Sequence, residues 1–462
     1  MTTRYHREGY DTYYAEGPSP TRDRLIEVRD RMQTIVERDN PGDWVWWWIA
    51  ERPFTIPEHT LETLQRGGEA LQRFFRAAND LFFDDPTVRQ RLEKTVSPNY
   101  RRLNDARRPD LPVMPRPDVV VDRNWNPKFV ELEITVCARA ETTTMSELYG
   151  NQPAHQLVDR YADYLAQQWP GGTLGLLAAP HPFWVDLPDD ANGFGKKIAR
   201  RGIDVELLTG DELPLLRYDG EALRLHKPDG TTKTIEVVDR FIDIYEIAEL
   251  NHPGMNALLD AYLDGAVDAV NTFKQSLDEK EWMALFWEEQ RADYWRRELG
   301  DGDFELLREM IPRTWRVDPD AEITPTDHRA LPMRNLGEIP ADRRNFIVKE
   351  SGTSTTSSGA QSVRNLAKID PGEIAPLLEE LGDRKASFIL QETVDSARID
   401  FTALDPLQER VVREFGARIK MSPFYIDGEL TDIKFIASNQ KLTVNDEACV
   451  ESVVDRTVGG EL

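Results

Sequence analysis

The chain has 462 residues and a formal net charge of −25, from 82 acidic against 57 basic residues. Hydrophobic residues make up 40% of it, which is enough to bury a core and excludes disorder over the whole length. The excess of acidic residues argues against a nucleic-acid partner, because proteins that bind nucleic acids present a basic surface.

The first six residues lack an apolar stretch, and no window reaches the roughly 18 apolar residues of a membrane span. The two cysteines, Cys137 and Cys449, do not suggest a disulfide framework. We therefore expect a cytoplasmic protein with no membrane partner. The cluster Trp44–Trp48 is expected to pack into a core or an interface, so a homodimer is one option.

The first hundred residues predict helices behind a polar tail. Residues 1–20 are rich in Tyr, Gly and Pro, whereas apolar residues recur at helical spacing over 22–38, 58–79 and 85–96. Nothing in this region points to a particular chemistry.

Two strands are predicted after Pro112, over 118–122 and 129–135, joined by a polar turn. Alternation puts Glu131, Glu133 and Thr135 on one face of the second strand, and Asp118 on its neighbour can face the same side. Carboxylates that converge in this way repel each other unless a cation lies between them. Oxygen ligands suit Mg²⁺, so the pattern predicts a magnesium site, with an exposed acidic face as the alternative.

Residues 154–275 alternate strands and helices, which indicates a parallel α/β sheet. The predicted strands cover 172–178, 204–208 and 242–247, with a helix over 193–201. An Asp-Gly turn within 215–225 predicts a short hairpin. Helices follow over 278–298 and 304–310.

The last third returns to strands and contains a candidate phosphate loop. An apolar strand over 345–350 carries Lys349 and leads into residues 351–360, which are Gly, Ser, Thr and Ala only. Small residues let backbone N–H groups approach phosphate oxygens, and a lysine supplies a point charge. The segment is not a Walker A motif, and a mobile surface loop is the alternative. Strands are also predicted over 387–392, 418–425 and 431–437.

Together these segments resemble the ATP-grasp superfamily. Arg116, Asp118, Phe129 and Glu133 fall in register with the metal hairpin of D-alanine–D-alanine ligases, with Thr135 where that family has Asn. The segments that resemble the family's nucleotide site are Lys280 before a helix, Lys349 with the loop Ser351–Gly359, and the adenine hinge of Gln391, Glu392 and Val394.

The order of these segments resembles the circularly permuted branch, which includes the glutathionylspermidine synthetase-like ligases, because the metal hairpin comes first. The resemblance implies an α/β fold with α+β elements: a permuted ATP-grasp fold with a Rossmann-like module and a helical N-terminal region. The expected parts are a tail and helical region (1–111), metal-binding strands (112–153), a Rossmann-like pre-ATP-grasp module (154–275), a helical linker (276–344), a lid with phosphate loop and adenine hinge (345–400), and C-terminal strands (401–462).

The resemblance implies an ATP-dependent carboxylate–amine or carboxylate–thiol ligase (EC 6.3-like) that acts through an acyl phosphate and releases ADP and phosphate. The expected partners are a small carboxylic acid and an amine, with ATP and Mg²⁺. A kinase-like enzyme and a non-catalytic nucleotide-binding protein are the alternatives. The implied site comprises Arg116 and Arg139 as catalytic residues, Asp118, Glu131 and Glu133 as metal ligands, and Lys280, Lys349, Ser351, Gly352, Ser357, Ser358, Gly359, Gln391, Glu392, Val394 and Lys420 as nucleotide contacts.

Overall fold

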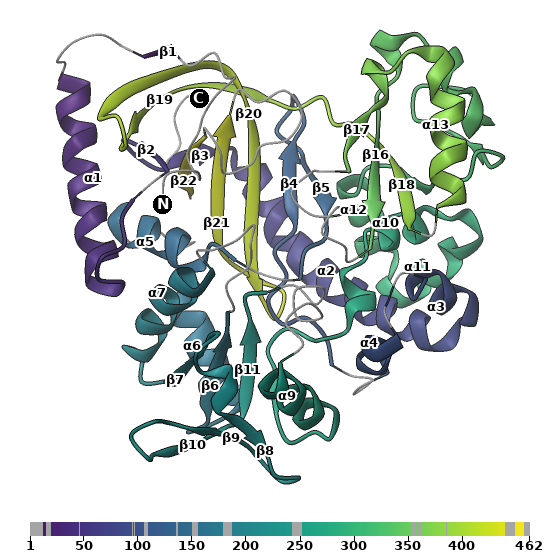
Figure 1. Cartoon of the computed structure of the whole chain (residues 1–462). Helices are drawn as coiled ribbons and strands as arrows, with labels where there is room; N and C mark the ends of the chain where they lie inside the picture. The colour runs from purple at the N-terminus through teal and green to yellow at the C-terminus, as the bar shows by residue number, and fades with distance from the viewer. Residues whose placement is uncertain are drawn as a thin grey trace.

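The computed structural model is a mixed α/β structure with several sheets (Figure 1). It describes residues 13–14, 20–45, 47–94, 96, 98–105, 110–134, 137–149, 156–178, 187–242, 252–352, 357, 362–384, 386–438 and 449–456.

The N-terminal region is helical, as predicted, but it also supplies strands to the largest sheet. Its elements are β1 (Tyr13–Tyr14), α1 (Pro20–Asp39), β2 (Trp48–Ala50), β3 (Phe54–Ile56), α2 (Glu58–Asp84), α3 (Pro86–Leu92) and α4 (Pro98–Asn104). The strands β2 and β3 correct the expectation of a purely helical region. Trp47 and Trp48 are buried beside or within β2, whereas Trp44 is partly exposed.

The largest sheet of the described residues runs in the order β19-β2-β22-β21-β20-β4-β5, and β19 also pairs with β20. Its strands are antiparallel except where β22 meets β2 and β3. The long strand β20 pairs with β4 at Met421 and Val119, so it carries the β4–β5 hairpin on its edge. The bounds are β4 (Asp118–Val121), β5 (Pro127–Glu131), β19 (Arg398–Asp405), β20 (Arg410–Ile426), β21 (Glu429–Ser438) and β22 (Val450–Arg456).

The β4–β5 hairpin is shorter than predicted. Asp118 lies opposite Glu131 at its open end, next to a register shift, and β5 stops there. The prediction that Glu133 and Thr135 continue the strand is therefore wrong for Glu133, and Thr135 lies outside the described residues. Glu133 is still held nearby, because its backbone oxygen accepts from Arg116 N at 2.9 Å.

A four-stranded parallel sheet, β12-β11-β6-β7, occupies the lower part of Figure 1. A three-stranded antiparallel sheet, β10-β9-β8, contains the predicted hairpin. The strand predicted over 242–247 falls mostly outside the described residues, and the third strand of this module is β11 instead. The bounds are α5 (Arg139–Tyr149), α6 (Leu157–Gln168), β6 (Thr173–Leu177), α7 (Leu187–Ala199), β7 (Asp204–Leu208), η1 (Leu213–Leu215), β8 (Leu216–Tyr218), β9 (Leu223–His226), β10 (Thr232–Ile235), β11 (Val237–Arg240), α9 (Pro253–Leu263) and β12 (Asp268–Ala269).

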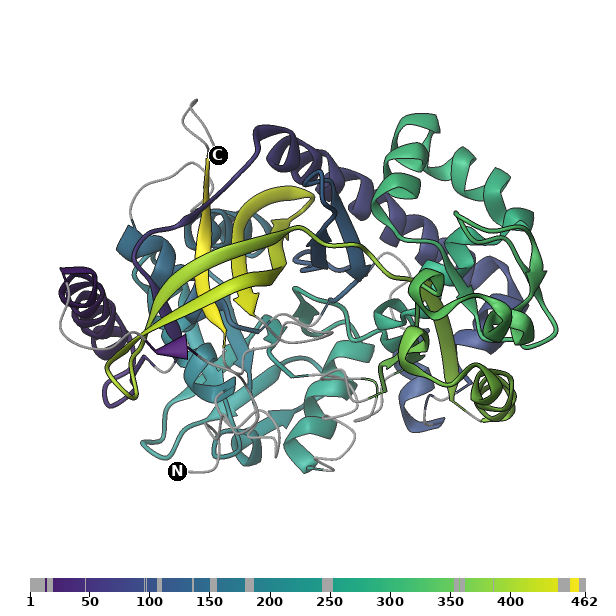
Figure 2. The same ribbon diagram turned by 90° about the horizontal axis from the view of Figure 1, so that it is seen from above.

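A smaller antiparallel sheet, β13-β18-β16-β17, carries α13 and forms the upper right of Figure 1. From above, the β4–β5 hairpin lies between β20 and this sheet (Figure 2). The bounds are η2 (Gln275–Asp278), α10 (Glu281–Trp287), η3 (Glu289–Arg291), α11 (Ala292–Leu299), α12 (Asp301–Met310), β13 (Thr314–Arg316), β14 (Glu322–Ile323), β15 (Leu331–Pro332), η4 (Met333–Glu338), η5 (Ala341–Arg343), β16 (Phe346–Ser351), β17 (Arg364–Asn365), η6 (Leu366–Lys368), α13 (Pro371–Asp383) and β18 (Ser387–Glu392).

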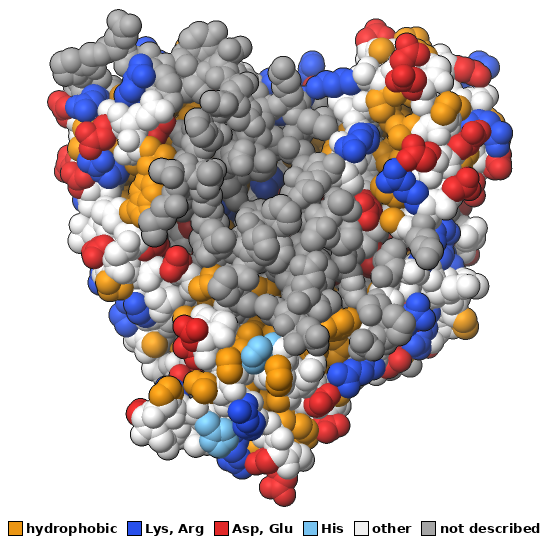
Figure 3. All heavy atoms as spheres, viewed as in Figure 1, with side chains coloured by type: hydrophobic (Ala, Val, Ile, Leu, Met, Phe, Trp, Pro, Cys, Tyr) orange, Lys and Arg blue, Asp and Glu red, His pale blue; other side chains and the backbone are white. Residues whose placement is uncertain are grey.

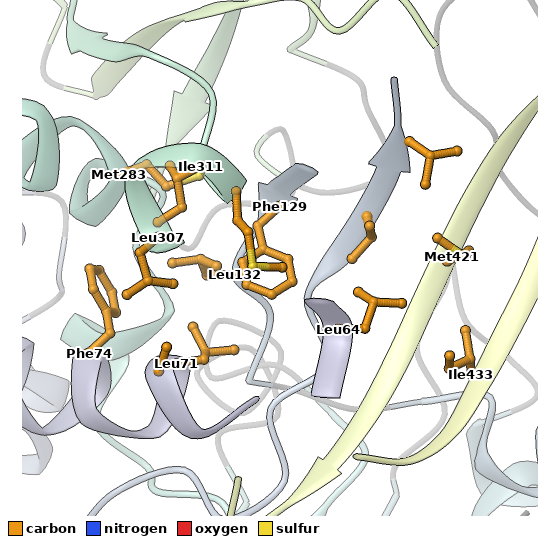
Figure 4. Packing of buried hydrophobic residues seen from close by; sticks show 14 of the residues in the cluster. Leu64, Leu71, Phe74, Phe129, Leu132, Met283, Leu307, Ile311, Met421 and Ile433 are labelled. Carbon is orange, nitrogen blue, oxygen red and sulfur yellow. The ribbon is translucent and has the colours of Figure 1, made fainter. Parts of the chain in front are cut away.

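The helix α2 links the two halves of the main core. Leu64 packs on the side of Met421 and Ile433 of the large sheet, while Phe74 lies on the side of Leu307 (Figure 4). The ring of Phe74 stacks on Trp295 with centroids 5.1 Å apart. The large sheet and the helices α10–α12 thus share one core and hold the β4–β5 hairpin between them.

The described surface carries both signs of charge. Figure 3 shows acidic and basic side chains interspersed near α13 on the face that it draws. Among the described helices, none is both long enough and apolar enough to span a bilayer.

Candidate functional site

Three lysines from separate elements reach the β4–β5 hairpin. Lys280 precedes α10, and its Nζ lies 2.6 Å from Glu131 Oε1. Lys349 on β16 donates from Nζ to the backbone oxygen of Val130 at 2.9 Å. Lys420 on β20 places Nζ 3.3 Å from Asp118 Oδ2. The structure thus brings lysines that are far apart in the sequence to one hairpin.

Lys349 differs from the other two because its ammonium group donates hydrogen bonds to neutral oxygens. It is 7% exposed, and its Nζ donates to Val130 O and to Gln391 Oε1, the latter at 3.1 Å. Burial lowers the pKa of Lys349, and this outweighs the opposing effect of the Glu131 carboxylate. A buried cation held by neutral oxygens is well suited to receive an anionic ligand.

The side chain of Lys280 is also largely buried, but Glu131 compensates its charge. Burial opposes the charged form, yet the nearby carboxylate raises the pKa of Lys280 overall. The same Nζ donates to the backbone oxygen of Ser357 at 3.1 Å, within the predicted phosphate loop. Lys280 therefore joins the hairpin to that loop.

The three predicted metal ligands each have a different cationic partner. Asp118 pairs with Lys420 and also accepts from Ser422 Oγ at 3.0 Å, and Glu131 pairs with Lys280. Glu133 accepts from Arg116 Nε at 3.1 Å and pairs with its Nη2. Burial opposes ionisation of Asp118, but Lys420 and Arg116 together lower its pKa.

These carboxylates do not form a metal cluster in this conformation. Their oxygens are chemically suitable for Mg²⁺, but within the described ranges no group of three or more His, Cys, Asp or Glu side chains could hold a metal ion. The predicted magnesium site of Asp118, Glu131 and Glu133 is therefore not assembled, because each carboxylate is turned to its own cation.

The predicted adenine hinge is also corrected in part. Gln391 is fully buried, and its amide bridges Lys349 Nζ and Thr314 Oγ1, at 3.1 Å each. Its side chain therefore orients Lys349 rather than facing a base. The carboxylate of Glu392 accepts from Thr326 N and Oγ1, both at 2.7 Å, while Val394 is half-buried just after β18.

A buried contact that sequence reasoning missed joins the end of β16 to the segment around Lys280. Ser351 Oγ donates to Glu279 Oε2 at 2.7 Å and accepts from the backbone N of Glu281 at 2.9 Å. Burial raises the pKa of Glu279 to about 8. Glu279 stands between Asp278 and Lys280 in the sequence, and nothing in this charged run predicts that its side chain is buried.

Glu279→Gln is expected to change how stability depends on pH. Burial raises the folded-state pKa of Glu279 above its ordinary value near 4.5. The stability that the neutral acid contributes to the fold is therefore complete below pH 4.5 and is lost as the pH rises to about 8. Glutamine keeps an acceptor for Ser351 but does not titrate, so the stability of the variant relative to the wild type should rise between pH 5 and pH 8. Urea unfolding at several pH values measures this, and a constant difference would contradict the buried neutral acid.

Arg139 does not reach the site. Its side chain is fully buried in an ion pair with Asp239, and its guanidinium lies 4.1 Å from the ring centroid of Phe241. We therefore withdraw the predicted catalytic role of Arg139, since no substrate can contact a side chain enclosed in this way. Ser351 and Gly352 lie at the end of β16 and Ser357 contacts Lys280, whereas Ser358 and Gly359 fall outside the described residues.

Comparison of the whole structure with solved structures finds a match over nearly the full length. A glutathione synthetase-like effector from Globodera pallida, in its apo form, superposes with a TM-score of 0.59. The match covers 96% of this chain and 98% of that chain, at 13% identity. This chain shares the fold of that effector.

A second structure, of a proposed gamma-glutamylcysteine synthetase from Methylobacillus flagellatus, has a TM-score of only 0.38 at 9% identity. That match covers 83% of this chain and 85% of the other, and at this TM-score it supports no inference. No protein-family model matches the sequence, and no curated protein matches it either. The likeness is therefore one of fold.

Proposed function

We propose that the protein is an ATP-dependent ligase of the circularly permuted ATP-grasp type, which joins a small carboxylic acid to an amine or thiol. The observation that carries the proposal is the convergence of Lys280, Lys349 and Lys420 on one acidic hairpin. The fold shared with a glutathione synthetase-like effector agrees with this proposal.

In the proposed reaction, the acid's carboxylate attacks the γ-phosphorus of ATP, which breaks the bond to the β-phosphate oxygen and releases ADP. The amine then attacks the acyl phosphate, expels phosphate and loses a proton. The protein's part is to position the reactants and to neutralise charge. Lys280 and Lys349 would hold phosphates, because Lys280 Nζ contacts the predicted loop at Ser357 O and Lys349 lies on β16, the strand that leads into that loop.

Arg116 is the residue that we assign to the acid or to the transferring phosphoryl group. Arg116 is 8% exposed, and its guanidinium is oriented by Glu133 and by the backbone oxygen of Cys137, the latter at 2.9 Å. A guanidinium fixed on one side by a carboxylate presents its remaining N–H groups in a defined direction. Glu133 is thus expected to act by positioning Arg116.

Glu133→Gln tests this assignment. We expect wild-type protein to release ADP only with a matching acid and amine, found by screening small acids and amino acids with mass-spectrometric detection of the product. Loss of the charged hydrogen bonds should lower the rate about 10- to 100-fold, because such bonds contribute about 1.5–3 kcal/mol. Glu429→Gln, which removes an exposed ion pair with Arg160, is the matched control and should leave the rate unchanged. Equal rates for Glu133→Gln and wild type would overturn the role of Glu133.

A non-catalytic nucleotide-binding protein is the second candidate. The observation that favours it is that Asp118, Glu131 and Glu133 are each paired with a cation and form no metal cluster among the described residues. ATP binding without ADP release, across the whole panel of acids and amines, would support this alternative over the ligase.

A further inference from the structure

The helix α5 begins directly after a backbone oxygen that holds Arg116. Arg116 donates from Nη1 to the oxygen of Cys137 at 2.9 Å, and the same Nη1 lies 3.9 Å from Cys137 Sγ. Only Ala138 separates Cys137 from Arg139, the first residue of α5. The position of the Cys137 oxygen, and with it the direction of the Arg116 guanidinium, therefore depends on how the start of α5 is held.

Ala138 is an unfavourable residue for this turn. Its φ is +60°, in the left-handed region that costs energy for a residue with a Cβ atom. It also precedes α5 at the position where Ser, Thr, Asp or Asn would offer a side-chain oxygen to the N–H groups of the first turn. Alanine has no such oxygen. The α5 corner, which we define as Cys137, Ala138 and Arg139, must therefore be held by other parts of the chain.

Asp190 on α7 supplies the cap that Ala138 cannot. Its Oδ1 accepts from Ala140 N at 2.6 Å and its Oδ2 accepts from Arg139 N at 3.2 Å, so both oxygens bind the first turn of α5, which neighbours α7 in Figure 1. Burial raises the pKa of Asp190 to about 6, and the two hydrogen bonds oppose this rise, so the carboxylate is ionised at neutral pH. A negative charge at a helix N-terminus is also favoured by the helix dipole.

Two further contacts hold the same turn through side chains. Arg139 is fully buried and pairs with Asp239 on β11, while Glu141 Oε2 lies 2.8 Å from Lys434 Nζ on β21. Asp190 instead binds the backbone, directly beside the α5 corner. It is also half-buried, so its replacement disturbs the fold less than breaking the fully buried pair of Arg139 and Asp239 would.

We infer that Asp190 is a positioning residue for Arg116: it caps α5, fixes the α5 corner, and so holds the Cys137 oxygen where that oxygen orients the guanidinium. This inference rests on the proposed role of Arg116 in the ligase reaction and adds a residue to it. Asp190 lies on the helix between β6 and β7 of the parallel sheet, whereas Arg116 precedes β4 of the large sheet. The geometry of the proposed site thus depends on a contact with the parallel-sheet module.

The first test labels the two cysteines with N-ethylmaleimide under native conditions and follows each by peptide mass spectrometry. Cys137 lies in the α5 corner, whereas Cys449 is buried just before β22 and reports general loosening of the fold. Asp190→Ala should accelerate labelling of Cys137 about 2- to 30-fold, the range expected for loss of a helix cap, and should leave Cys449 unchanged.

Two other variants complete the labelling experiment. Asp190→Asn keeps one side-chain acceptor, so its rate should fall between those of wild type and Asp190→Ala, and it carries the comparison if the alanine variant does not fold. Asp189→Asn is the matched control, because Asp189 is the exposed neighbour on α7 and accepts from Asn40 Nδ2 at 3.2 Å. It should label like the wild type.

The second test asks whether Asp190 acts through Arg116. Arg116→Gln should lower the rate of ADP release about 10- to 100-fold, and Asp190→Ala should lower it about 2- to 30-fold. The double variant should be no slower than Arg116→Gln alone, because the clamp then has nothing left to position. A merely structural role of Asp190 would make the two losses multiply.

Equal labelling of Cys137 in the wild type and in both Asp190 variants would overturn the inference. Equal acceleration at Cys449 would overturn it as well, since the substitution would then loosen the whole fold, and so would losses that multiply in the double variant. Absence of ADP release from the wild type with every acid and amine would overturn the proposed function instead. The labelling rates need no substrate, so they still decide whether Asp190 holds the α5 corner.

Discussion

Replacing Gly68 by alanine is expected to destabilise the protein by about 2 kcal/mol or more, although alanine is the better helix former. Gly68 lies in the middle of α2, where the helix meets the turn between β20 and β21. A Cβ atom at this position would lie 2.3 Å from the backbone oxygen of Gly428 and 2.4 Å from Cδ1 of Tyr425. Neither neighbour can move freely, because Tyr425 is buried and its hydroxyl donates to Leu64 O at 2.8 Å.

The helix-propensity gain of alanine is at most about 1 kcal/mol, so the steric term should win. Gly302→Ala is the matched control, since a Cβ there meets nothing within 4 Å and α12 is also a helix. Urea unfolding should show a clear loss of stability for Gly68→Ala and no loss for Gly302→Ala. If the two variants were equally stable, α2 would not pack against the β20–β21 turn as closely as the structure has it.

Lys349→Met is expected to lower ATP affinity about 10- to 100-fold while leaving the fold as stable as before, or more stable. The first effect follows from loss of a charged contact, which is typically worth about 1.5–3 kcal/mol. The second follows from burial, because an apolar side chain of similar length avoids the cost of desolvating an ammonium group. Weaker ATP binding together with unimpaired stability would distinguish a ligand-binding role of Lys349 from a structural role.

Lys128→Met serves as the control for this prediction. Lys128 lies on β5 of the same hairpin, but its Nζ is exposed and donates to the backbone oxygen of Glu309 at 2.6 Å. Calorimetric titration with ATP, together with thermal unfolding, compares the two variants. Unchanged ATP affinity in Lys349→Met would remove Lys349 from the proposed nucleotide site.

The sequence pattern predicted the regular elements well where they are long. The helix α2 and the strands β16, β18 and β21 fall where periodicity placed them. The strands β2 and β3 were missed, because three residues are too few to show a period. Their partners also lie in β22, at the other end of the sequence, which no local pattern can indicate.

The sequence explains why β5 ends early, but the alternation of apolar and polar residues does not show it. Pro115 and Pro117 precede β4, and proline cannot donate a hydrogen bond to a neighbouring strand. The regular pairing of β4 with β5 therefore stops at Asp118 and Glu131. Beyond it, Glu133 is held by Arg116, through the backbone bond from Arg116 N to Glu133 O and through the ion pair of their side chains.

The resemblance predicted which residues form the site, but it predicted none of their pairings, and Arg139 lies elsewhere. Resemblance to a family placed Lys280, Lys349 and the hairpin acids in one site, and the structure brings them together. The resemblance could not give the register of β16 and β18, in which Gln391 lies diagonally across from Lys349, because that register is set by the whole sheet. The role of Gln391 as a partner of Lys349 depends on that register.

The parallel pairing of β2 with β22 also affects how the chain can reach its fold. Ser452 Oγ donates to Arg52 O although the two residues are 400 positions apart in the sequence. During synthesis, β2 is made long before β22. Trp48 and Ile49 therefore lack their β22 partners until β22 has been synthesised. Contacts between such distant segments slow folding, and an uncovered apolar strand favours association with other chains in the meantime. Refolding should therefore be slow and sensitive to protein concentration, with the closing of β22 as its final step.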